Sequence, residues 1–106
     1  MTNAERQHVT VEEDGHVFAT ADVHSDPDSG LVQAWLHVES GHLPPGTRTR
    51  LVDAVLDLPD LPTGAHLRAA LPTGDAEILD RVRQRCSDVE LRAAGSSCLL
   101  DGTLSG

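Results

Sequence analysis

Six histidines among 106 residues are the first candidates for site chemistry, because imidazole is a common metal ligand. His16 and His24 are eight residues apart on one expected strand, a separation of about 26 Å, so they cannot share an ion. His16, His37 and Glu39 fall on one face of paired strands and form a candidate zinc set. No Cys-x-x-Cys or His-x-x-x-His spacing accompanies them. Exposed or packing histidines are therefore the favoured interpretation, and no metal or other cofactor is predicted.

Nucleophilic side chains lack the sequence contexts that activate them. The chain has no lysine and no tyrosine, which excludes a Schiff base and a tyrosine acid. Cys98 has no surrounding motif of a catalytic thiol, and Ser96–Ser97 lie outside any Gly-x-Ser-x-Gly elbow. Cys86 and Cys98 are expected to be free, inward-facing thiols. No catalytic residue is assigned.

The arginines are the second group that could bind a ligand. Arg81, Arg83 and Arg85 share one expected helix, and Arg48 and Arg50 lie on another. They could hold an anion or an acidic partner, but solvated helix faces are the favoured interpretation.

Charge and composition limit the classes of partner. The formal net charge is −9, which disfavours both nucleic acid and anionic membranes. No segment approaches the roughly 20 apolar residues of a membrane span, and Met1–His8 has no apolar signal core. We expect a cytoplasmic protein with a single α+β domain over residues 1–106, frayed at 1–7 and 102–106.

Alternating apolar residues predict an antiparallel meander of three strands, at 9–11, 17–23 and 31–39. One face of the sheet must be buried. A three-residue turn with a bulge at Gly15 places Val9, Val11 and Val17 together on that face. A four-residue turn would then pair Val23 with Val32 and Val17 with Val38.

Helical and strand patterns alternate in the second half. Thr47 or Thr49 caps a helix that runs to Leu58 and stops at Pro59. A strand at 66–71 is followed by a helix from Ala76 to about Cys86, with Asp75 at its start. A final hairpin turns at 95–96 and pairs Ala93 with Cys98. The expected element order is β-β-β-α-β-α-β-β.

The meander register places both aromatic residues on the face away from those valines. That face is expected to carry an interface made by Phe18, Trp35, Thr20, Gln33 and His37. If both helices cover the other face, an exposed aromatic surface is typical of an interaction site for a protein partner or a second copy of the chain. The alternative, in which a helix crosses over and buries the aromatics as core, remains open.

The element order, and the passage Leu67–Leu79 from strand to helix, are similar to the second half of the GNAT N-acetyltransferase fold. The resemblance covers residues 16–104 and implies a truncated GNAT-like architecture without the helices that precede the meander. It also implies an acyl-CoA site, because the family holds the coenzyme pyrophosphate in a Gln/Arg-x-x-Gly-x-Gly/Ala loop that opens a helix.

The stretch Leu43–Arg48 corresponds to that loop and departs from it. Only Gly46 keeps its place, and two prolines have no N–H to donate. A reduced coenzyme site would consist of Gly46, Thr47, Arg48 and Arg50. We predict that acetyl-CoA binding is absent or weaker than millimolar. The leading interpretation is a non-catalytic interaction module, and the alternative is a reduced acyl-CoA-binding domain.

Overall fold

The computed structural model describes residues 5–26, 28–39, 41, 43–58, 61, 64–72 and 74–104. It contains six strands and two helices in the predicted order. Their bounds are β1 Glu5–Glu13, β2 His16–Asp26, β3 Leu31–Val38, α1 Thr47–Leu56, β4 His66–Pro72, α2 Ala76–Arg85, β5 Cys86–Ala94 and β6 Ser97–Leu104. The predicted α+β class is confirmed.

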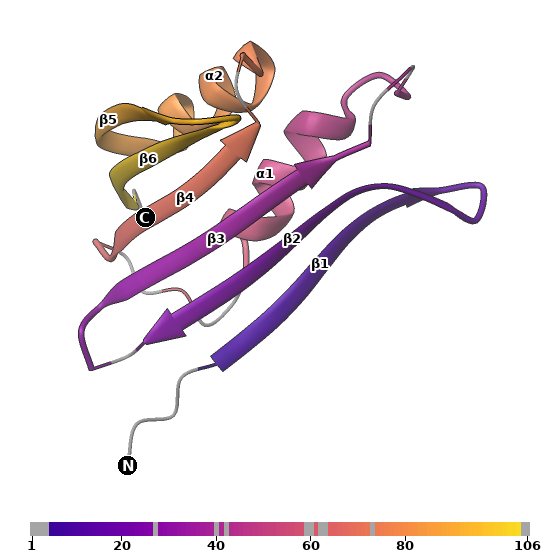
Figure 1. Cartoon of the computed structure of the whole chain (residues 1–106). Coiled ribbons are helices and arrows are strands. Elements are labelled where there is room, and N and C mark those ends of the chain that lie inside the picture. Colours follow the sequence, from indigo (N-terminus) through magenta and orange to yellow (C-terminus); the bar gives the residue numbers. More distant parts are fainter. Residues whose placement is uncertain are drawn as a thin grey trace.

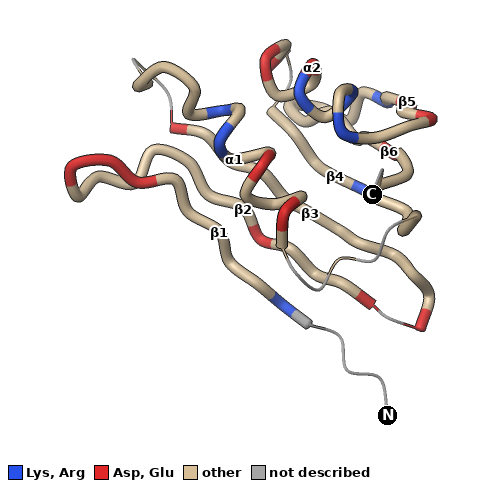
Figure 2. Tube along the Cα trace, turned by 180° about the vertical axis from the view of Figure 1, so that it is seen from behind, with Lys and Arg blue, Asp and Glu red and all other residues tan. Residues whose placement is uncertain are grey.

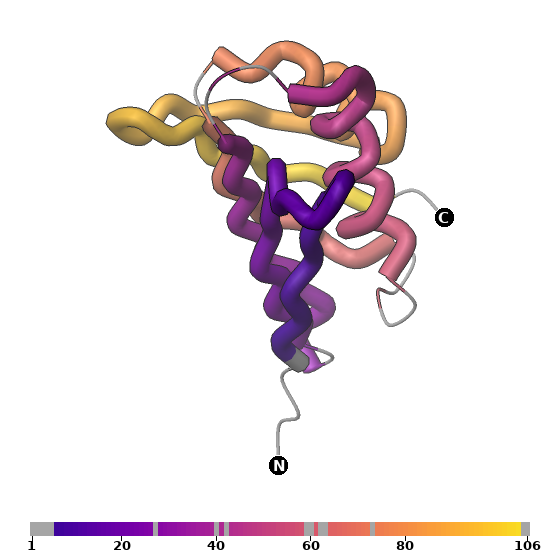
Figure 3. Tube along the Cα trace, turned by 90° about the vertical axis from the view of Figure 1, so that its right-hand side faces the viewer, coloured from indigo at the N-terminus to yellow at the C-terminus, as the bar shows by residue number. Residues whose placement is uncertain are grey.

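All six strands form one sheet in the order β1-β2-β3-β4-β6-β5 (Figure 1). Every neighbouring pair is antiparallel except β3 and β4, which are parallel. Apolar residues of α1 and α2 share one core with one face of the sheet. Its fully buried centre includes Val23, Val32, Leu51, Val52, Leu67, Ile78 and Leu100. The edge-on view shows α1 lying along one side of the first strands (Figure 3). The opposite sheet face has no helix over it in the part of the chain that the structure describes.

The β1–β2 hairpin differs from the predicted bulged turn. Asp14 and Gly15 both have positive φ, 53° and 80°, so they form a two-residue turn between Glu13 and His16. The irregularity lies instead within the strands, where Val11 pairs with Ala19 but Glu12 pairs with Val17. The extra residue in β2 is Phe18. The bulge was therefore misplaced, and the prediction that Val17 lies on the apolar face is wrong, because Val17 pairs with Glu12 and is 40% exposed.

The β2–β3 register differs from the prediction by two residues. Val23 pairs with Ala34, not with Val32, and Ala19 pairs with Val38. Gly30 explains the shift, because it has a left-handed φ of 69° and its N–H donates to the Asp26 carbonyl at 3.0 Å, inside the turn. A two-residue shift preserves the side-chain faces. Ala19, Ala21, Val23, Val32 and Ala34 are therefore buried on the predicted apolar face, although their predicted pairs were wrong.

The second half has the predicted element order, but the limits predicted for α1 are wrong. Its N-cap is Gly46, not Thr47 or Thr49, and it ends at Leu56, two residues before the predicted Leu58. Asp75 is the N-cap of α2, and its Oδ1 accepts the Ile78 N–H at 3.1 Å. Ala93 pairs with Cys98, as predicted for the final hairpin. The predicted fraying at 102–104 is wrong, because β6 continues to Leu104, which is buried. Residues 5–7 are likewise paired with β2. Pro59 and the last two residues lie outside the described part of the chain.

Candidate functional site: a notch between β3 and β4

The central parallel pair of strands opens at its carboxyl end. β3 and β4 pair from Leu31–Trp35 to His66–Ala70, and among the described residues the pairing stops there. β3 continues to Val38 and β4 to Pro72. Beyond Trp35, β3 remains paired with β2, and beyond Ala70, β4 remains paired with β6. Each strand therefore presents a backbone edge to the gap between them.

A wide-open surface depression with a volume of about 420 Å³ lies at this end of the sheet. We call it the notch. Its lining comes from the end of β3, the first turn of α1, the end of β4 and the start of α2. The lining residues are Val38, Glu39, Arg48, Pro72, Gly74, Asp75, Ala76 and Glu77.

The start of α1 presents uncapped backbone donors. Gly46, the N-cap, has a left-handed φ of 79° and makes no side-chain cap hydrogen bond. The Thr47 N–H and hydroxyl both donate to the Pro44 carbonyl, at 3.3 and 2.7 Å. The first N–H bonded within the helix is that of Arg50, which donates to Gly46. Among the described residues, the N–H groups of Arg48 and Thr49 therefore have no hydrogen-bond acceptor, and they lie at the positive end of the helix dipole.

The start of α2 is satisfied and negatively charged. Asp75 caps the helix through one oxygen and accepts Arg48 Nε on the other at 2.8 Å. The carboxylates of Glu39 and Glu77 also line the notch. Because Arg48 is already paired with Asp75, the charge of the notch is net negative, and the α1 start is its most favourable place for an anion.

The four residues of the predicted coenzyme site have separate positions. Arg48 lines the notch, and Gly46 sets the start of α1. Thr47 is buried and bonded to Pro44, so its hydroxyl closes the loop. Arg50 lies near Glu13, with an Nη1–Oε2 distance of 3.8 Å. Asp75 and Glu77 were not predicted as part of this site, although the Asp75 cap signal placed both at a helix start.

The predicted aromatic surface is not continuous. Trp35 is exposed, at 48%, and pairs with Asp22, four residues along β2 from Phe18. Four residues of strand span about 13 Å, so the two aromatics are not diagonal neighbours. Phe18 is half-buried and instead packs against the ring of His16, with centroids 4.5 Å apart. On either side of the Asp22–Trp35 pair, Thr20 pairs with His37 and His24 pairs with Gln33.

The histidine candidates do not gather around a common point. His16 Nε2 lies 2.6 Å from Glu39 Oε2, which confirms that these two residues are close. Within the described ranges, however, no three His, Cys, Asp or Glu side chains form a group that could hold a metal ion. A histidine–carboxylate pair on an exposed sheet face accounts for this contact.

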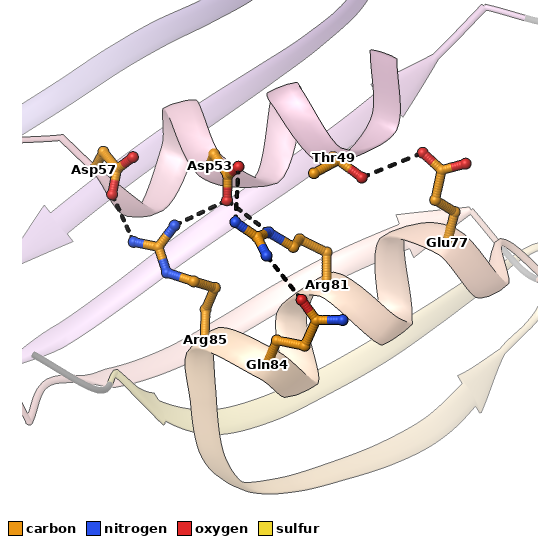
Figure 4. Close-up of polar contacts among 7 residues, drawn as sticks. All are labelled: Thr49, Asp53, Asp57, Glu77, Arg81, Gln84 and Arg85. Atoms are coloured by element: carbon orange, nitrogen blue, oxygen red, sulfur yellow. Dashed lines mark hydrogen bonds and ion pairs between the residues drawn. The ribbon is translucent and has the colours of Figure 1, made fainter. Parts of the chain in front are cut away.

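Two of the three arginines of α2, Arg81 and Arg85, face α1, not solvent as predicted. Arg81 and Arg85 both donate to Asp53, and Arg85 also donates to Asp57 (Figure 4). Thr49 and Glu77 are joined at 3.4 Å near the notch end of the same helix pair. Arg83 is exposed. This network ties the two helices together and thereby holds their N-terminal ends on either side of the notch.

Comparisons with known proteins identify the architecture. No protein-family model and no curated protein matches the chain. One solved structure that does match is yncA from Salmonella typhimurium, described as "a putative acetyltransferase" and solved with its cofactor acetyl-CoA. The TM-score is 0.62 at 14% identity, over 94% of this chain and 64% of that one. No described helix has the length and apolar character needed to cross a membrane. The match to this solved structure shows that the chain has a partial GNAT-like fold, as its element order had indicated.

Proposed function

We propose that this chain is an acyl-CoA-binding domain whose ligand lies in the notch between β3 and β4. The observation that carries the proposal is the divergence of these two strands beyond Trp35 and Ala70, directly beneath the uncapped start of α1. The likeness in fold to a protein solved with acetyl-CoA supports it.

The notch suits the chemistry of an acyl-pantetheine arm. The arm is slender and carries two amide groups, which can exchange hydrogen bonds with an unpaired strand edge as another strand does. The β3 edge beyond Trp35 provides such an edge. Val38, Pro72 and Ala76 supply apolar contact along the walls.

The phosphates are bound less well than the arm. The N–H groups of Arg48 and Thr49, at the positive end of the α1 dipole, would attract the phosphates. The carboxylates of Glu39, Asp75 and Glu77 would repel them. Affinity is therefore expected near or weaker than millimolar, which is about −4 kcal/mol. The proposal assigns binding and no catalytic step.

Calorimetry or amide NMR with acetyl-CoA and with acetyl-pantetheine tests the proposal. Glu77→Arg removes one opposing charge and adds a favourable one, so it should strengthen acetyl-CoA binding about tenfold and leave acetyl-pantetheine unchanged. Glu90→Arg, the same change on exposed β5 outside the notch, is the matched control and should have little effect. Ala76→Trp should abolish binding of both ligands by filling the notch. Equal strengthening by Glu77→Arg and Glu90→Arg, or no chemical-shift change at Leu36–Val38, contradicts the proposal.

A second candidate function is protein binding through the sheet face around Trp35. The large exposed indole favours it, together with a hollow of about 320 Å³ lined by Arg6, Asp22, Val23, His24 and Trp35. Trp35→Ala should then abolish a protein contact but leave acetyl-CoA binding intact. Loss of coenzyme binding in Trp35→Ala would contradict this separation of the two surfaces.

A further inference from the structure

The hollow beside Trp35 brings opposite charges and an aromatic ring together on the sheet face that lies away from the helices. It has a volume of about 320 Å³ and is lined by Arg6, Asp22, Val23, His24 and Trp35. That volume is near the lower limit of the roughly 300–1,000 Å³ typical of small-molecule sites. The hollow is therefore large enough for a small ligand.

The strand register fixes the arrangement of the lining. Arg6 of β1 pairs with His24 of β2, and Asp22, two residues earlier in β2, pairs with Trp35 of β3. Paired residues share a face of the sheet, and so do residues two apart in one strand. The four side chains therefore form two adjacent rows across three strands, with Arg6 and Trp35 at opposite corners.

Arg6 and Asp22 carry opposite charges that do not neutralise each other directly. Arg6 is the basic residue near the start of β1 (Figure 2), and it makes no ion pair with another described residue. Asp22 Oδ1 lies 2.8 Å from His8 Nδ1, a contact that uses one of the two carboxylate oxygens. Asp26, the next carboxylate along this face of β2, is not part of the lining, and its Oδ1 accepts the Asp28 N–H at 3.0 Å. The hollow thus offers a guanidinium and a carboxylate to one ligand.

The apolar surface of the hollow comes mainly from the indole. Trp35 is 48% exposed, whereas Val23 is buried. Aromatic rings stack on an exposed indole more favourably than their area alone would predict. A ligand of this hollow is therefore expected to carry an aromatic ring beside its charged groups.

We propose that the hollow binds a free aromatic α-amino acid in its zwitterionic form. The α-carboxylate pairs with Arg6, which can hold it through two parallel hydrogen bonds. The α-ammonium group donates to Asp22, and the aromatic ring stacks on the indole of Trp35. A purely anionic ligand would be repelled by Asp22 and a purely cationic one by Arg6, so the two charges together select a zwitterion.

This site is separate from the notch. Trp35 precedes Val38 by three residues of β3, which is about 10 Å along the strand, and an odd spacing places the two side chains on opposite faces. The proposal therefore does not depend on acyl-CoA binding, and either proposal can fail without the other.

Fluorescence titration with L-phenylalanine tests the proposal, because Trp35 is the only tryptophan and phenylalanine does not absorb where indole is excited. L-Phenylalanine should change the emission saturably, with an affinity near millimolar because one side of the hollow faces solvent. Phenylethylamine lacks the carboxylate and phenylpropionate lacks the ammonium group, so each should bind about tenfold more weakly. No saturable change with L-phenylalanine, or equal affinity for the three ligands, overturns the proposal.

A matched pair of variants tests the role of Arg6. Arg6→Gln should weaken binding of L-phenylalanine about tenfold without weakening that of phenylethylamine. Arg92→Gln is the control, because Arg92 shares the sheet face through a row of pairs with Leu99, Ala70 and Trp35 but lies on the edge strand β5. Arg6 and Arg92 are exposed, so circular dichroism should show both variants folded. Equal weakening by the two variants overturns the proposed carboxylate contact.

Amide NMR locates the ligand without any variant. L-Phenylalanine should shift the signals of Asp22–His24 more than those of Leu36–Val38, and the reverse order would place it in the notch and overturn the proposal. Protection of Trp35 that appears only as the protein concentration rises, with no effect of L-phenylalanine, would indicate a protein partner and overturn the proposal as well.

Discussion

Arg81 and Asp53 are joined by two parallel hydrogen bonds, from Nε to Oδ1 at 2.8 Å and from Nη2 to Oδ2 at 3.0 Å. The same carboxylate accepts a third bond, from Arg85 at 2.8 Å (Figure 4). One carboxylate of α1 therefore holds two guanidinium groups of α2. Paired fork geometry of this kind is among the stronger polar contacts in proteins, and here it fixes the relative position of the helices that begin at the notch.

Asp53→Asn should lower the free energy of unfolding by about 1–2 kcal/mol, because Arg81 and Arg85 lose the charge of their shared acceptor. Urea denaturation at pH 7 measures the change. Asp80→Asn removes a carboxylate from the exposed surface of α2 and is the control. If the two variants have the same stability, the network contributes nothing beyond net charge.

The stabilising effect of Asp53 should disappear in acid. The hydrogen bond from Arg81, reinforced by Arg85, holds the pKa of the Asp53 carboxyl below its usual range despite desolvation. A group with a lowered folded pKa stabilises the protein above its unfolded value, about 3.9, and loses that effect as pH falls through the folded value. The difference in Tm between wild type and Asp53→Asn should therefore be constant at pH 6–7 and shrink below about pH 4. A difference that grows in acid contradicts this sign.

Asp101 should behave in the same way on the opposite sheet face. Its hydrogen bond with His66, followed by that with Arg68, lowers the pKa of the Asp101 carboxyl. We expect the Tm of Asp101→Asn to approach that of wild type below about pH 4, as for Asp53→Asn. Thermal scans between pH 2 and pH 7 measure both variants in one series, and a constant difference for Asp101→Asn would show that its charge is not the cause.

Gly46→Ala should destabilise the protein by about 1–2 kcal/mol, because an L-residue is strained at its left-handed φ of 79°. Apart from its two chain neighbours, no described residue has an atom within 4 Å of the position of an added Cβ, so the cost is conformational and not steric. Gly46→Asn is the matched control and should lose less, since asparagine tolerates this conformation. Equal losses for Ala and Asn would indicate another cause.

Trp35 should emit as a solvent-exposed indole when the protein is dilute, because it is the only tryptophan and 48% exposed. Trp35→Asp should remain folded by circular dichroism for the same reason. Acrylamide quenching at increasing protein concentration measures whether a partner covers the ring. Emission that is already blue-shifted and protected in dilute solution, or unfolding of Trp35→Asp, would contradict the exposed position.

Reducing agents and chelators should leave Tm unchanged within a degree or two. Cys86 and Cys98 are free thiols, and burial raises the pKa of the Cys86 thiol. Iodoacetamide should therefore label the half-buried Cys98 before Cys86, which mass spectrometry resolves. Faster labelling of Cys86, or a large loss of stability with either reagent, would contradict these assignments.

The sequence by itself determined the elements and their order. Strict alternation of apolar residues identifies strands, and local signals identify ends, as in the Asp75 cap and the 95–96 turn that pairs Ala93 with Cys98. The dry face of the meander was also predictable, because alternation specifies which side of a strand is apolar. Alternation does not specify which residues pair, since a shift of two residues keeps every side chain on its face.

Only the tertiary structure decided the relationships that depend on several chain segments at once. The position of Gly30 inside its turn moved Trp35 opposite Asp22 and away from Phe18. The divergence of β3 from β4 created the notch, and the packing of α2 against α1 turned Arg81 from an expected surface residue into a partner of Asp53. These contacts join residues that are distant in sequence. Their formation depends on how whole elements pack, which no local pattern of residues encodes.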